Sequence, residues 1–287
     1  MKKITFILFI TIFLTTALYG MTTEKYSKVA SMTLGGDEII LSLIPPDRIA
    51  GLSGKINKDE QVSNIVHKAH GFPEIEGNIE VVMNLEPDLI ITGDWVDKEY
   101  LLQLKDTGID TYIYKTPVSW EEQVTVIKEL SHLLNAEKQG NEIIMDMEQR
   151  LQKLQRKIRD QYKDKKPDIL LYSSMGTTNG KNTFFDSITK CLLANNIASA
   201  NGINKYEKIS KEKVIEINPD ILIIPIWNKH PDNENFLDFI KNDKSFQELK
   251  AVKNNRVYAI DYRYISTTSQ YIIDGIEKLG EKIYNLN

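Results

Sequence analysis

The order of apolar and polar residues along the chain predicts alternating strands and helices. Short apolar runs, largely β-branched, recur at 29–32, 49–52, 89–92 and 111–114, and a helical pattern follows each run. The runs are continuous rather than alternating in polarity. This is typical of strands that are buried on both faces, as in a parallel sheet covered by helices. The pattern therefore predicts an α/β fold.

A long amphipathic helix is predicted in the middle of the chain. Between residue 136 and about residue 162 there is no proline, and apolar residues recur at spacings of three and four, namely Ile143, Met147, Leu151, Leu154 and Ile158. At 1.5 Å per residue such a helix is about 40 Å long, enough to reach from one lobe to another. Further apolar runs at 169–173, 221–225 and 257–260 and a helical pattern over 275–284 predict a second α/β lobe.

The two halves of the chain share a repeated segment. Residues 77–95, GNIEVVMNLEPDLIITGDW, align without gaps with residues 209–227, ISKEKVIEINPDILIIPIW. A glutamate before the helix, a Pro-Asp turn and a tryptophan after the strand all keep the same register. We interpret the repeat as a duplicated lobe, which divides the chain into a lobe at 21–135, a connecting helix at 136–165 and a lobe at 166–287.

The first twenty residues have the pattern of a secretory signal peptide. Lys2 and Lys3 precede an uncharged apolar run of about 15 residues, which is short for a membrane span of about 20. A bacterial lipoprotein needs a cysteine directly after such a run, but the single cysteine of the chain is Cys191. We therefore expect a periplasmic or otherwise extracytoplasmic protein without a lipid anchor, and no disulfide within the chain.

Charge argues against a nucleic-acid partner. The sequence has 36 Lys and Arg residues against 40 Asp and Glu residues, for a net charge of −4, and no basic stripe with interleaved aromatic residues.

Residues that follow the predicted strands are candidates for a binding site. In open α/β sheets, ligands bind beyond the carboxyl ends of the strands, and two lobes leave a cleft there. The candidates are aromatic or mildly polar: Met32, Thr33, Gly35, Asp94, Trp95, Met175, Gly176, Thr177, Thr178, Asn179, Trp227, Tyr262, Arg263, Tyr264 and Ser266. Large flat side chains across a gap suit a bulky, partly apolar ligand, and Arg263 is placed to pair with a carboxylate or phosphate on it.

Other chemistries find less support. Residues 173–183 follow a strand and precede a helix, but they lack the spacing of a nucleotide-binding loop, so we expect a flexible turn that shapes one wall of the cleft. Only His67 and His70 are close in sequence among the four histidines, which is too few ligands for a bare metal ion such as Zn²⁺ or Mn²⁺. No nucleophile has a base at a diagnostic spacing. A metal-ion carrier and a secreted enzyme with Asp94 as its acid remain as alternatives.

The sequence resembles the extracytoplasmic solute-binding proteins of ABC importers for iron chelates, haem and cobalamin. The resemblance rests on residues 77–91, the mirrored residues 209–224, the long connecting helix, the segment YSSMGTTNGKNTFFDSI at 172–188 and the segment AVKNNRVYAID at 251–261. It covers nearly the whole chain after the signal peptide.

The resemblance implies two Rossmann-like α/β lobes with central parallel sheets, joined by one long α-helix. It also implies a monomer that is not an enzyme and has no cofactor of its own. Such a protein holds a ferric siderophore, haem or corrinoid in its cleft and delivers it to an ABC permease dimer. Glu80 and Glu212 match the acidic residues with which the family docks onto the permease. A haem ligand would favour Tyr262 or Tyr264 as a tyrosinate on the iron. The resemblance gives the location of the site, not the identity of the chelate.

Overall fold

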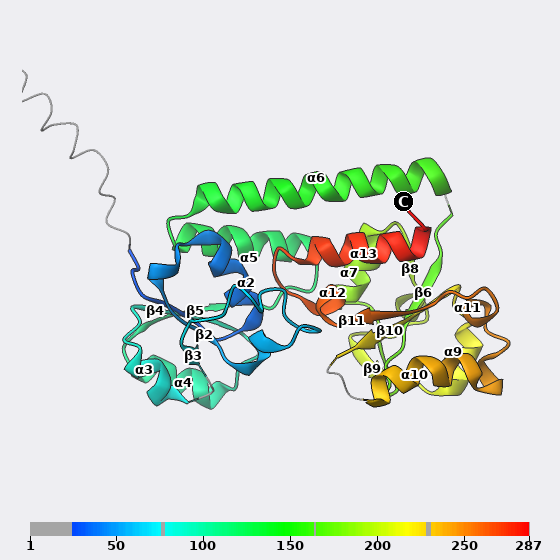
Figure 1. Ribbon diagram of the computed structural model, residues 1–287, viewed down its shortest axis with the longest axis horizontal. Coiled ribbons are helices and arrows are strands. Elements are labelled where there is room, and N and C mark those ends of the chain that lie inside the picture. Colours follow the sequence, from blue (N-terminus) through cyan, green and yellow to red (C-terminus); the bar gives the residue numbers. More distant parts are fainter. Residues whose placement is uncertain (1–24, 76–77, 164, 228–230, 287) are drawn as a thin grey trace, which may run out of the picture.

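The computed structural model describes residues 25–75, 78–163, 165–227 and 231–286, with the side chains of 231–234 excepted. The predicted signal peptide lies outside these ranges. Within them, no helix is both long enough and apolar enough to cross a membrane. Figure 1 shows two lobes side by side beneath one long helix, α6.

The first lobe contains a parallel sheet. Within the described residues its strand order is β3-β2-β1-β4-β5, and every neighbouring pair is parallel. Its elements are β1 (Val29–Ser31), α2 (Leu34–Leu43), β2 (Ile49–Ser53), β3 (Glu74–Ile75), α3 (Ile79–Asn84), β4 (Leu89–Gly93), α4 (Lys98–Asp106), β5 (Asp110–Tyr114) and α5 (Trp120–Leu133). The predicted strands at 29–32, 49–52, 89–92 and 111–114 are confirmed to within one or two residues.

The second lobe repeats this architecture. Its main sheet has the order β11-β10-β6-β8, again parallel, and β7 and β9 form a separate antiparallel pair. Its elements are β6 (Asp168–Leu171), β7 (Thr177–Asn179), α7 (Phe184–Cys191), β8 (Asn195–Asn196), α8 (Ile197–Ala200), β9 (Tyr206–Lys208), α9 (Lys211–Ile217), β10 (Ile221–Ile226), α10 (Pro231–Asn242), α11 (Lys250–Lys253), β11 (Val257–Asp261), α12 (Arg263–Ser266) and α13 (Ile272–Tyr284). The expected flexible turn at 173–183 contains a strand, β7, because its polar residues pair with β9.

The connecting helix α6 spans Glu137–Tyr162, close to the predicted 136–162. It buries one stripe, with Ile144, Met147, Leu154 and Ile158 facing inward. These residues belong to one hydrophobic cluster that also contains residues of β1 and α5 in the first lobe and of β6 and α13 in the second. Because the two lobes share this core under α6, the helix packs along both of them rather than acting as a free linker.

The sequence repeat is a structural duplication. The helix α3 and strand β4 occupy the same aligned positions as α9 and β10. Between helix and strand, Glu86 and Asn218 both take the left-handed conformation with φ of 49°. The next two residues are Pro-Asp in each copy, so the chain turns in the same way before each central strand.

The aspartate of each Pro-Asp turn ties the repeat to the neighbouring strand. Asp88 accepts hydrogen bonds from the backbone N–H of Ser27 at 2.7 Å and of Lys28 at 2.9 Å, just before β1. Asp220 accepts one from the backbone N–H of Asp168 at 3.1 Å, at the start of β6. In each lobe the turn therefore holds the start of the strand, β1 or β6, that pairs with the repeated strand, β4 or β10.

Candidate functional site

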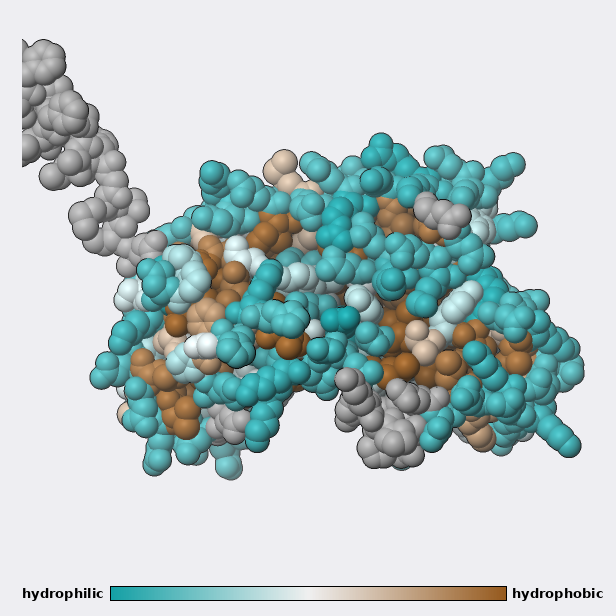
Figure 2. Space-filling model, viewed as in Figure 1, coloured by the Kyte–Doolittle hydropathy of each residue, from teal (hydrophilic) through white to brown (hydrophobic). Residues whose placement is uncertain are grey.

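A cavity of about 360 Å³ lies in the cleft between the lobes, at the carboxyl ends of the first sheet. Figure 2 shows the molecule hollowed between the lobes on the side away from α6. The cavity is lined by residues that follow or end strands, by a loop after β2 and by the segment around α12: Met32, Thr33, Leu34, Gly35, Ser53, Ile56, Val62, Trp95, Tyr114, Thr116, Tyr262, Ser266, Thr267 and Thr268. This is where α/β sheets bind ligands.

The floor of the cavity is built on the start of α2. Thr33 caps this helix by accepting the Gly36 N–H at 3.1 Å, and its hydroxyl lies 2.7 Å from that of Tyr114 at the end of β5. Burial raises the pKa of Tyr114 to about 12, so its hydroxyl is neutral at pH 7. Gly35 is required here, because a side chain on it would collide with Thr268 of the opposite lobe.

One buried carboxylate holds the two walls of the cavity together. Glu38 in α2 is fully buried and accepts hydrogen bonds from the Asn64 N–H at 2.9 Å and the Thr267 hydroxyl at 2.6 Å, and a further one from the Ser269 hydroxyl. Gln270 also donates to the Glu38 carbonyl oxygen at 2.7 Å. Residues 267–270 of the second half thus rest on the first lobe, so both lobes contribute to the cavity in a fixed arrangement.

The aromatic side chains lie toward the open side. Trp95 is 66% exposed and lines the cavity from the loop after β4. Tyr262 lines it from the second lobe, and its ring packs edge-on against Trp227 with 5.5 Å between ring centres. Trp227 thus packs on a residue of the lining, but of the two repeated tryptophans only Trp95 lines the cavity itself.

The other predicted site residues lie around the cavity or apart from it. Asp94 is exposed beside Trp95, and its carboxylate accepts the N–H and the hydroxyl of Thr116 at 2.9 and 2.6 Å. The hydroxyl of Thr116 is the main cause that lowers the pKa of Asp94. Arg263 and Tyr264 line a different hollow, which they share with Arg150 and Asp274.

The segment at 173–183 stays outside the cavity lining. Met175 is 66% exposed, the Thr177 hydroxyl pairs with that of Ser173 at 2.6 Å, and the Asn179 carbonyl accepts from the Asn196 side chain at 2.9 Å. A role for these residues in binding remains a prediction. The sequence prediction also missed several lining residues, namely Leu34, Ser53, Ile56, Val62, Tyr114, Thr116, Thr267 and Thr268. Tyr114 and Thr116 end and follow a predicted strand, so the rule that found Trp95 applies to them too.

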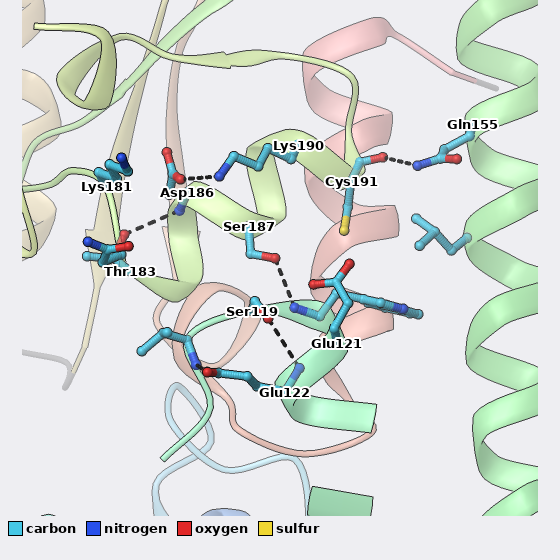
Figure 3. Close-up of a pocket in the computed structure, with 14 residues that line it drawn as sticks. Ser119, Glu121, Glu122, Gln155, Lys181, Thr183, Asp186, Ser187, Lys190 and Cys191 are labelled. Atoms are coloured by element: carbon cyan, nitrogen blue, oxygen red, sulfur yellow. Dashed lines mark hydrogen bonds and ion pairs between the residues drawn. The ribbon is translucent and has the colours of Figure 1, made fainter. Parts of the chain in front are cut away.

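A second cavity of about 470 Å³ lies under α6, at the seam between α5 and α7 (Figure 3). Its polar groups are largely paired with one another. Ser187 accepts the Trp120 N–H at 2.9 Å across the lobes, Asp186 binds Lys190 at 2.6 Å, and Gln155 donates to the Cys191 carbonyl oxygen. Side chains that already satisfy each other have little left to offer a ligand, so we assign this seam to structure.

Metal ligands do not converge in the described part of the chain. No group of three or more His, Cys, Asp or Glu residues is placed there to hold a metal ion. His67 and His70 are exposed.

Comparison with known proteins identifies the family. The family model described as periplasmic binding protein matches residues 29–264. An uncharacterised ABC transporter substrate-binding lipoprotein of Bacillus subtilis, YvrC, is 25% identical, with 91% of this chain and 81% of that protein covered. The iron-uptake system-binding protein of the same organism is 27% identical over 82% of this chain and 74% of its own length.

A solved structure supports the fold. It is that of a periplasmic solute-binding protein of Staphylococcus epidermidis, described as a possible iron-binding protein. The TM-score is 0.76 at 26% identity, with 91% of this chain and 99% of that chain covered. YvrC is named a lipoprotein, which counts against the expectation of a protein without a lipid anchor. A lipid anchor requires a cysteine directly after the N-terminal apolar run, whereas the single cysteine of this sequence, Cys191, lies in α7. The match over residues 29–264 covers most of the sequence, and the chain belongs to the periplasmic binding protein family of substrate-binding proteins.

Proposed function

We propose that this protein captures a metal chelate, either an iron chelate such as a siderophore or haem, or cobalamin, and delivers it to an ABC permease. The single observation that carries the proposal is the cavity between the lobes, into which Trp95 and Tyr262 project from opposite sides. Aromatic side chains that stay exposed in a cleft suit a large, partly apolar ligand. The name of one relative, the iron-uptake system-binding protein, agrees with this class.

The fixed cleft favours binding rather than bond making. The cavity floor is preformed by the Thr33–Tyr114 hydrogen bond and by Glu38, so little ordering is required when a ligand enters. The lining contains hydroxyl and aromatic groups, and Asp94, the acid considered for an enzyme, is held by Thr116 as a carboxylate. A carboxylate with a lowered pKa is a poor general acid.

Docking onto the permease is proposed for the two acidic residues of the repeat. Glu80 and Glu212 are both exposed and both lie in the first turn of a helix, α3 or α9, that is capped by Asn78 or Ser210. Equivalent charges on two pseudo-symmetric lobes match a permease built from two like subunits.

Substitution of Trp95 tests the binding site. We expect Trp95→Ala to weaken chelate binding by at least about tenfold, because an exposed aromatic anchor is lost, while Trp95→Phe retains most of the affinity. Calorimetric titration with a panel of ferric siderophores, haemin and cyanocobalamin measures the affinities, and thermal unfolding checks that both variants are folded. Equal affinity of Trp95→Ala and the unchanged protein for the bound chelate would refute this location of the site.

A further inference from the structure

The lining of the interlobe cavity is uncharged. Its residues are aromatic or aliphatic side chains, glycine, and the hydroxyl residues Thr33, Ser53, Thr116, Ser266, Thr267 and Thr268. Within this lining there is no Lys, Arg, His, Asp or Glu. The hydroxyl groups offer hydrogen bonds to neutral oxygen and nitrogen atoms of a ligand but no countercharge for an anion. An anionic group buried here would lose its hydration without gaining an ion pair.

One charged group beside the lining is the acidic residue Asp94. Asp94 is exposed, directly precedes Trp95, and accepts two hydrogen bonds from Thr116, which itself lines the cavity. The hydroxyl of Thr116 lowers the pKa of Asp94, so the carboxylate is ionised at pH 7. A negative charge at this position repels an anionic ligand and tolerates a neutral or cationic one.

Two described basic residues beside the lining, Lys115 and Arg263, have acidic neighbours. Lys115 forms an ion pair with Glu122 at 2.5 Å. Arg263 lies 3.6 Å from Asp261, stacks on the ring of Tyr264 and lines the separate hollow. Arg263 does not line the cavity, and its pairing with an acidic group of the ligand stays a prediction.

Two buried acids hydrogen-bond to residues of the lining. Glu38 accepts the Thr267 hydroxyl at 2.6 Å, and its carboxylate offers no countercharge for an anionic ligand. Ser53 lines the cavity and donates to the buried Asp37, and burial raises the pKa of Asp37 to about 8, so this carboxyl is largely protonated. Burial also raises the pKa of Tyr262, so its hydroxyl is neutral at pH 7 while no metal ion is bound to it.

We infer that the cavity selects a metal chelate without net negative charge, held between Trp95 and Tyr262 and hydrogen-bonded by the threonine and serine hydroxyls. This rests on the proposed function and narrows its ligand class. A ferric trihydroxamate and a corrinoid both satisfy the chemistry, since each presents neutral oxygen or nitrogen acceptors and apolar surface. Ferric citrate, a ferric tricatecholate and a haem with buried propionates do not.

Titration with chelates of different charge tests the inference. We expect ferrichrome or cyanocobalamin, both neutral, to bind at least about a hundredfold more tightly than ferric citrate, a ferric tricatecholate or haemin, measured by calorimetry in the same buffer. Whichever of the two neutral probes binds distinguishes an iron carrier from a corrinoid carrier. If an anionic chelate binds as tightly as the better neutral probe, the inference is wrong while the proposed function stands. If none of the five probes binds, the proposed function falls and the inference with it.

A charge added to the lining gives a second, independent readout. Ile56 lines the cavity and is 47% exposed, so Ile56→Lys places a cation at the site without filling a core. Ile113 on β5 is 45% exposed and lies outside the lining, so Ile113→Lys is a control with the same change in charge. We expect Ile56→Lys to narrow the preference for the neutral chelate by about tenfold and Ile113→Lys to leave it unchanged. Equal effects of the two variants, or no effect of Ile56→Lys, would contradict an uncharged lining as the source of selectivity.

Discussion

At the scale of single residues, the repeated Pro-Asp turns show why one side chain recurs in the two halves. Asp88 accepts the Ser27 N–H at 2.7 Å, the Ser27 hydroxyl at 2.8 Å and the Lys28 N–H at 2.9 Å. A single carboxylate thereby orders the chain where it enters β1. Partial burial raises the pKa of Asp88, but these hydrogen bonds outweigh it, so the pKa is lowered overall.

The lowered pKa makes the contribution of Asp88 to stability depend on pH. A carboxyl group with a lower pKa in the folded state stabilises the fold above its unfolded pKa of about 3.9 and loses that contribution as pH falls through the folded value. We expect Asp88→Ala to reduce the free energy of unfolding by about 2 kcal/mol at pH 7 and by much less near pH 3. Urea unfolding at both pH values measures this.

Asp106 provides the control for Asp88. It is exposed at the end of α4, so Asp106→Ala should change the free energy of unfolding by less than about 0.5 kcal/mol at either pH. A loss for Asp88→Ala that is the same at pH 7 and pH 3 would show that the carboxylate charge does not matter at this turn.

At the scale of elements, the strands could be predicted because each central strand is a continuous apolar run. Such runs are buried on both faces, and Leu89, Ile90 and Ile91 of β4 are all fully buried. The short strands β7 and β9 were not predicted. They are polar, and the exposed residues of β9 carry no periodic pattern. Their pairing depends on contacts between segments far apart in sequence, which local propensity does not encode.

The candidate site was predictable only in part, for a related reason. Met32, Thr33, Trp95 and Tyr262 end or follow apolar runs, so the rule for strand ends placed them in the cavity. Ile56 and Val62 come from the segment between β2 and β3, where Ile56 lies in a short 3-10 helix (Lys55–Lys58) and Val62 in the loop that follows. Their place in the lining follows from how that segment folds back over the sheet, and nothing in its local pattern indicates it.

The helices α3 and α9 present the proposed docking charges. We expect Glu80→Lys combined with Glu212→Lys to abolish chelate uptake by cells that carry the permease, because both helices would then present the wrong sign of charge. Chelate affinity of the purified variant should not change, since neither residue lines the cavity. Uptake of labelled chelate and calorimetry separate the two effects.

A matched control uses two other exposed acids on helices. Glu99 lies in the first turn of α4 and Glu148 in α6, away from α3 and α9, so Glu99→Lys with Glu148→Lys makes the same change in net charge. We expect this variant to support normal uptake. Equal loss of uptake in both double variants would mean that overall charge, and not docking by the repeated helices, is responsible.

At the scale of the whole molecule, the two lobes are joined by more than the connecting helix. One hydrophobic cluster runs under α6 through both lobes, and the Arg150 side chain on α6 binds Asp274 of α13 at 2.6 Å. On the cleft side, Glu38 of the first lobe accepts the hydroxyl groups of Thr267 and Ser269. The lobes are therefore held on both the helix side and the cleft side, and we expect only small changes in the angle between them when a ligand binds.

Substitution of Glu38 tests this second connection. Its loss leaves several buried donors without an acceptor, so we expect Glu38→Ala to lower the free energy of unfolding by about 3 kcal/mol. We also expect faster amide exchange in residues 266–272 and weaker chelate binding, because Thr267 and Thr268 line the cavity.

Asp37→Asn is the control: Asp37 is equally buried in the same helix, but its side-chain partners Ser53 and Asn57 belong to the first lobe. Because burial keeps Asp37 largely protonated at pH 7, the amide should replace it with a smaller loss of stability and unchanged exchange at 266–272. If Glu38→Ala destabilises the protein without faster exchange in that segment, the carboxylate supports only the first lobe, and the cleft depends on α6 and its core for its shape.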